Sequence, residues 1–152
     1  MSGVGQSIYY ERNEIYDELA ADEDGIFGSN LRLLVFAATV GYARNRYVHD
    51  HDTDGETRWG FIDGDKRLSV IVSSIAYAHE QDPDVILDTD AKVEMLTSFG
   101  AGGARILKEE VMDEPGENLD NLITFMREHR DETEAKEQAG ILEEIEENFG
   151  SL

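Results

Sequence analysis

LRLLVFAATVGY, residues Leu31–Tyr42, is the stretch that decides the fold, because it is apolar on almost every side of a helical period. A helix without a polar face is typical of the buried centre of a domain. Ser29 or Asn30 can cap its first turn through a side-chain oxygen, and Gly41 is placed to end or kink it. We therefore expect a mainly helical fold built around this segment.

The apolar residues on both sides of this helix also recur with helical spacing. Ile8, Ile15 and Leu19 predict a first helix, which an acidic, glycine-containing turn at 21–28 follows. Further helices are predicted from Asp65 to about His79, from Asp88 or Asp90 through Leu107, from about Leu119 to His129, and through Ile141–Phe149. The fold class expected is all-α or mainly α: a compact bundle of five to six helices in one domain, 1–152, with 1–7 as a flexible N-terminus.

Two stretches depart from simple helical spacing. Residues 44–65 form one long acidic loop, in which Arg58–Ile62 alternates enough to predict a short strand; a stable β-ribbon would need a second strand. Gly100, Gly102 and Gly103 interrupt the fourth predicted helix, where each costs roughly 1 kcal/mol relative to alanine. Either the helix divides there or another backbone approaches closely, and we interpret the glycines as a helix-packing motif.

Composition limits the class of protein. The chain has no cysteine, which excludes disulfides, thiolate metal sites and thiol nucleophiles. No segment reaches the roughly 18 apolar residues that span a bilayer, and the N-terminus does not look like a secretory signal, so we expect a cytoplasmic protein without membrane contact.

The charge is strongly acidic, with 34 Asp and Glu against 13 Lys and Arg and a net charge of −21. A disordered acidic tail does not fit the 40% hydrophobic content. A DNA mimic and a surface adapted to molar salt both fit. Because lysine is rare even among the bases, we favour salt adaptation, in which screening shortens the range of self-repulsion to about 3 Å.

The loop His49–Glu56 contains the most metal-like motif. Asp50, Asp52 and Asp54 alternate before a glycine, as in the first half of a calcium loop. The match then fails, because the twelfth position is Phe61 where a bidentate glutamate is needed. A metal-dependent enzyme built on this loop is therefore an alternative. We predict no metal and no cofactor, and no catalytic residues can be assembled from the sequence.

Basic residues are concentrated in one place, between Leu31 and Val48, where no acidic residue occurs. The candidates for contact with nucleic acid or a partner are Arg32, Arg44 and Arg46, with Tyr42 and Tyr47 as aromatic neighbours. Arginine clamps phosphate, and aromatic rings stack on bases. The competing interpretation is that the arginines satisfy the last carbonyls of the helix or pair with the acidic loop.

Two strings resemble a known family. Phe27–Ser29 followed by LVFAATVGYARNR, Leu34–Arg46, and then Phe99–Leu107 with its double glycine, are similar to patterns of the Dnd system-associated protein 4 family. The resemblance covers roughly residues 8–130, and Ala101 stands where the second pattern leads us to expect Asn. These are small accessory proteins encoded with DNA phosphorothioation systems, whose larger partners carry the sulfur-transfer, ATPase and nuclease activities.

The resemblance implies a non-catalytic adaptor in a phosphorothioation-dependent modification and restriction system, a form of antiviral defence. It would bind larger protein subunits of that complex, and DNA contact is possible in principle. The alternatives are a small helix-turn-helix-like DNA-binding regulator that uses Leu31–Val48, and the metal-dependent enzyme described above. The sequence does not decide the oligomeric state.

Overall fold

The computed structural model describes residues 6–20, 29–128 and 130. In chain order, its elements are β1 (Ser7–Tyr10), α1 (Glu14–Leu19), α2 (Asn30–Ala43), β2 (Gly55–Arg58), α3 (Trp59–Asp63), α4 (Lys66–Glu80), the 3₁₀ helix η1 (Pro83–Leu87), α5 (Thr89–Leu107), the π-helical turn η2 (Lys108–Met112) and a helix at 118–128. The expected mainly α fold is confirmed, and a two-stranded ribbon is its small β component.

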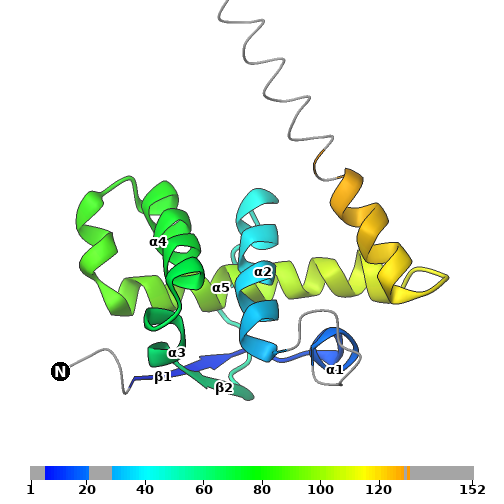
Figure 1. Cartoon of the computed structure of the whole chain (residues 1–152), viewed down its shortest axis with the longest axis horizontal. Coiled ribbons are helices and arrows are strands. Elements are labelled where there is room, and N and C mark those ends of the chain that lie inside the picture. Colours follow the sequence, from blue (N-terminus) through cyan, green and yellow to red (C-terminus); the bar gives the residue numbers. More distant parts are fainter. Residues whose placement is uncertain (1–5, 21–28, 129, 131–152) are drawn as a thin grey trace, which may run out of the picture.

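The core is built on the crossing of α2 over α5, which Figure 1 shows near the middle of the molecule. The glycine-rich segment does not divide α5, which is continuous over 19 residues. Instead another backbone approaches: a Cβ at Gly103 would overlap the carbonyl oxygen of Ala37 and lie 2.9 Å from the backbone nitrogen of Gly41. Gly41, predicted to end or kink its helix, does not end it, because α2 continues to Ala43; Gly41 packs against the backbone of Phe99.

The predicted helix starts are confirmed by their caps. Ser29 accepts a hydrogen bond from the backbone nitrogen of Arg32 at the start of α2. Asp65 accepts from two backbone nitrogens in the first turn of α4, and Asp88 accepts from one in the first turn of α5. Each of these side chains satisfies donors that have no partner within the helix itself.

The N-terminal segment differs from the prediction. Ile8 lies in β1, which pairs antiparallel with β2 in the register Ile8↔Thr57, and not in a helix with Ile15 and Leu19. Ile8 and Tyr10 are buried on one side of this strand while Tyr9 is exposed, a spacing of two that favours a strand. Gln6 and Ser7, which fall in the segment expected to be flexible, are held beside β2.

The strand predicted at Arg58–Ile62 is displaced. β2 ends at Arg58, and the next five residues form α3, because Trp59 and Ile62 are buried at a spacing of three. The C-terminal helix predicted at Ile141–Phe149 and the turn at 21–28 lie outside the described residues, as does His129. Within the described ranges, no helix combines the length and the apolar character needed to cross a membrane.

Candidate functional site

The three glycines of α5 all face α2 or the chain that follows it. A Cβ at Gly102 would lie 2.8 Å from the carbonyl carbon of Arg46 and one at Gly103 would lie 2.5 Å from that of Ala37. A Cβ at Gly100 would meet only the flexible Cδ1 end of Leu34, at 2.6 Å. These contacts support the interpretation of the segment as a helix-packing motif.

Arg44 and Arg46 are brought together at the C-terminal end of α2, where both meet the glutamates of η2. Arg44 Nη1 lies 3.3 Å from Glu110 Oε2, and Arg46 Nη1 lies 3.5 Å from Glu109 Oε2. The Arg44 guanidinium also lies 5.5 Å from the centre of the Phe125 ring. The carboxylates that pair with Arg44 and Arg46 belong to η2 and not to the acidic loop that follows α2. The prediction that these arginines pair with carboxylates is therefore right in kind, but the predicted partners are wrong.

The two predicted contact tyrosines, Tyr42 and Tyr47, both pack against Phe99 of α5. Tyr42 and Tyr47 meet the Phe99 ring edge-on, with centroids 5.6 and 5.0 Å away, and each is 37% exposed. Tyr47 also stacks on His79 in the last turn of α4. The rings therefore connect α2, α4 and α5, and His79 has an aromatic contact in addition to its place at the helix end.

Arg32 lies apart from the other two arginines. It belongs to the first turn of α2, about 18 Å along the helix from Arg44 at 1.5 Å per residue. It is exposed, and no carboxylate in the described ranges forms an ion pair with it. The structure therefore does not unite the five predicted contact residues into one basic surface.

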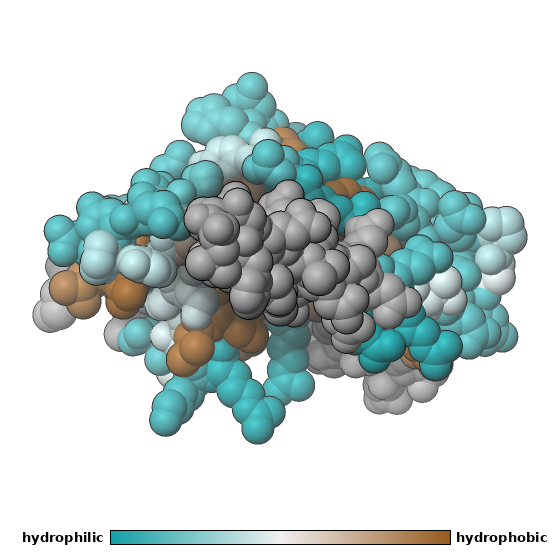
Figure 2. All heavy atoms as spheres, turned by 90° about the horizontal axis from the view of Figure 1, so that it is seen from above, coloured by the Kyte–Doolittle hydropathy of each residue, from teal (hydrophilic) through white to brown (hydrophobic). Residues whose placement is uncertain are grey.

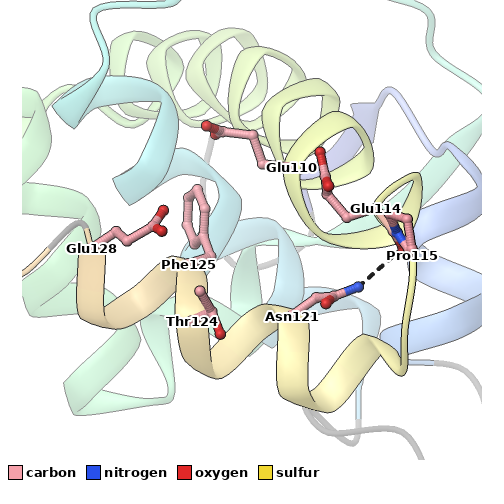
Figure 3. Close-up of a pocket in the computed structure, with 7 residues that line it drawn as sticks. All are labelled: Glu110, Glu114, Pro115, Asn121, Thr124, Phe125 and Glu128. Carbon is pink, nitrogen blue, oxygen red and sulfur yellow. Dashed lines mark hydrogen bonds between the residues drawn. The ribbon is translucent and has the colours of Figure 1, made fainter.

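A cavity of ≈ 310 Å³ lies next to Arg44, between η2 and the helix at 118–128 (Figure 3). Its lining consists of Glu110, Glu114, Pro115, Asn121, Thr124, Phe125 and Glu128. Asn121 Nδ2 donates to the carbonyl oxygens of Val111 and Glu114, which ties the helix to the turn before it. The three carboxylates make this cavity unsuitable for phosphate, so it adds nothing to a nucleic-acid site.

The buried carboxylate of Glu11, just after β1, holds the acidic loop in place through hydrogen bonds. Glu11 accepts both Nε and Nη2 of Arg105, at 2.8 and 2.7 Å, and also the backbone nitrogen of Asp52 at 3.1 Å. The hydrogen bonds from Arg105 lower the pKa of Glu11, although burial opposes them. Next to Glu11, the backbone nitrogen of Arg12 donates to Asp54 Oδ1. These bonds connect Asp52 and Asp54 of the loop to the segment that follows β1.

Among the predicted metal candidates, Asp54 through its side chain and Asp52 through its backbone take part in contacts of this kind. Asp54 receives the bond from Arg12, and the ring of His51 bonds to the carbonyl oxygen of Asp52. Within the residues that the structure describes, Asp50, Asp52 and Asp54 do not form part of any group of three or more ligands that could hold a metal ion.

The most distinctive surface is a shallow apolar groove along the outer side of α4, beside η1. We call it the α4–η1 groove; its volume is ≈ 380 Å³ and its lining is Ser69, Val70, Ser73, Ser74, Tyr77 and Ile86. Leu87, at the end of η1, is 87% exposed. Figure 2 shows hydrophobic side chains gathered toward the end of the molecule where Figure 1 places α4. An exposed apolar surface among polar residues is typical of a protein-binding site.

Sequence reasoning missed this groove. Val70 and Tyr77 lie on the side of α4 opposite Val72 and Ile75, which are buried. The only sequence signal is the apolar run after Pro83, Val-Ile-Leu, which stands between two aspartates and is too short to predict an element. Val85 from this run is buried, and its two apolar neighbours are not.

The fold and its surfaces define a small, mainly helical protein that is held together by a glycine-mediated helix crossing and carries an exposed apolar groove. The family described as DNA sulphur modification system-associated protein 4 matches residues 8–145, so the chain belongs to this family. The match confirms the resemblance seen in the sequence. Neither the curated proteins nor the solved structures include a match to the chain.

Proposed function

We propose that the chain is a non-catalytic accessory subunit of a DNA phosphorothioation-dependent modification and restriction system, and that it binds a larger protein subunit through the α4–η1 groove. Membership of the family gives the association with a DNA sulphur modification system. The groove supplies the observation that carries the adaptor role, since it exposes large apolar side chains on a chain of net charge −21.

The energetics of the groove support protein binding. Val70, Tyr77 and Ile86 are 57%, 45% and 42% exposed, and the almost fully exposed Leu87 follows Ile86 in the chain. Burying one such aliphatic side chain completely contributes about 1.5–3 kcal/mol. A few side chains supply most of the binding energy in many protein interfaces, and tyrosine, here Tyr77, is among the types enriched at such positions. Ser69, Ser73 and Ser74 add little bulk between them, which leaves room for a partner's side chains.

Direct DNA contact at the C-terminal end of α2 is less well supported. Phosphate would have to replace the carboxylates of Glu110 and Glu109 as partners of Arg44 and Arg46. It would also have to approach the three carboxylates that line the neighbouring cavity. We therefore assign the adaptor role to the groove and keep these arginines as structural residues.

The test is purification of the tagged full-length protein from its native cells in molar KCl, followed by identification of the bound proteins. We expect subunits of a DNA sulphur modification or restriction complex to co-purify, and Val70→Asp, which places a charge in the lining of the groove, to abolish their recovery. Leu119→Asp is the matched control, because Leu119 is 51% exposed on the helix at 118–128, away from α4. Recovery of the wild-type chain without any such subunit would refute the proposal.

A further inference from the structure

The charges around the α4–η1 groove are arranged with a polarity. Lys66, Val70, Ser73, Tyr77 and Glu80 follow one another at spacings of three and four, so they form one stripe along α4. Lys66 lies at the N-terminal end of this stripe, and Glu80 lies at its C-terminal end. At 15 residues and 1.5 Å per residue, α4 separates these ends by about 20 Å.

The acidic end of the groove is reinforced by η1 and the residues around it. Glu80, Asp82, Asp84 and Asp88 line a second depression of ≈ 200 Å³, and its lining residue Val85 directly precedes Ile86 of the groove in η1. Asp82 and Asp88 act as caps through backbone nitrogens. Among the described residues, no cation forms an ion pair with Glu80 or Asp84. Two carboxylates are therefore open to a partner.

We infer that the groove receives an amphipathic helix of a partner protein, with large apolar side chains along one face and lysines or arginines at the end that lies over Glu80 and Asp84. This inference rests on the proposed function and specifies the partner of the same surface. The apolar stripe selects a helix because Val70, Ser73, Ser74 and Tyr77 cover two turns on one face. Glu80 and Asp84 favour a helix with a positively charged end. Because Lys66 lies at the other end of the groove, the charges also favour one orientation of that helix along α4.

Two fluorescein-labelled synthetic peptides test this chemistry. Both are 18-residue amphipathic helices with the same leucine and phenylalanine face; one carries four lysines near one end, and the other carries four glutamates there. Fluorescence anisotropy is measured at the lowest KCl concentration at which the circular dichroism spectrum of the protein is unchanged. We expect the lysine peptide to bind at least tenfold more tightly, and Val70→Asp, in the lining of the groove, to weaken its binding at least tenfold. Equal affinities for the two peptides would overturn the inference.

General attraction between a basic peptide and an acidic protein requires its own control. The double variant Glu80→Lys/Asp84→Lys is compared with Glu117→Lys/Asp120→Lys, which lies on another part of the surface. Each of the two substitutions raises the net charge by two, so both double variants have a net charge of −17 instead of −21. The first variant should lose the preference for the lysine peptide, while the second should keep it. An equal loss in both would show that the preference follows net charge alone, and would refute the assignment to this groove.

Co-purification from native cells separates the failure of this inference from the failure of the proposed function. If Val70→Asp removes the larger subunit and Glu80→Lys/Asp84→Lys does not, the groove binds the partner but the inferred basic end is wrong. If Val70→Asp leaves the subunit bound, the groove itself is wrong. Light scattering of the purified protein provides the remaining check, because a dimer that Val70→Asp converts to a monomer would make a second copy the occupant and overturn the inference.

Discussion

Gly103→Ala is the substitution that most directly tests the helix crossing at the centre of the fold. The new Cβ would lie 2.5 Å from the carbonyl carbon of Ala37, and it would overlap the carbonyl oxygen. Carbon atoms pack best at a separation of about 3.5 Å, so the contact with the carbonyl carbon alone requires α5 and α2 to move apart by about 1 Å, and the overlap with the oxygen requires more. Neither neighbour can yield by a rotamer change, because the contacted atoms belong to the backbone.

The expected cost exceeds the usual benefit of the substitution. In an open helix, glycine to alanine stabilises by about 1 kcal/mol. Overpacking a core costs about 1–3 kcal/mol and sometimes more, and here the whole crossing must open. We expect a net loss of about 3 kcal/mol in the free energy of unfolding. In a domain of this size that corresponds to a fall of about 10 °C in Tm.

Gly100→Ala is the matched control in the same helix. Its Cβ would meet the Cδ1 end of Leu34, which can rotate away, and the Leu34 carbonyl oxygen is 3.6 Å distant. We expect its stability to lie within about 1 kcal/mol of the wild type, since helix propensity offsets the local contact. Urea unfolding in KCl, followed by circular dichroism, measures both variants. Equal stabilities for Gly100→Ala and Gly103→Ala would refute the argument from backbone contact.

Two further predictions concern the charged residues. Glu11→Gln should lower the free energy of unfolding at neutral pH by about 2 kcal/mol, since it weakens the charged bonds from Arg105. Because the folded protein lowers the pKa of Glu11, its contribution is complete at neutral pH and declines below the ordinary value of 4.5, as the pH falls through the folded pKa. Arg44→Ala and Arg46→Ala should each cost less than about 1 kcal/mol, and electrophoresis with duplex DNA should give the same result as for the wild type.

Each of these predictions has a contrary outcome. If the stability of Glu11→Gln falls with acid as steeply as that of the wild type below pH 4.5, the acid sensitivity arises at other carboxylates. If duplex DNA binds the wild type in a salt-dependent manner and either arginine variant weakens that binding, then these arginines contact phosphate, and the regulator hypothesis replaces the structural one.

The helix starts could be predicted from the sequence because they depend on residues only a few positions apart. The caps Ser29, Asp65 and Asp88 were predictable because a side chain satisfies backbone donors two or three residues away. β1 was not predictable in this way, because Ser7–Tyr10 becomes a strand only by pairing with residues almost fifty positions later. Sequence patterns near Ile8 favoured a helix, and a long-range partner overrode them.

The sequence by itself determined the mainly helical class, the central helix Leu31–Tyr42 and the family, because all three depend on local spacing and short motifs. Only the tertiary structure decided which glutamates neutralise Arg44 and Arg46, since η2 lies more than sixty residues further along the chain. It also decided that Val70 and Leu87 face solvent. Whether an apolar side chain is buried depends on what packs against it, and the sequence of one helix does not contain that information.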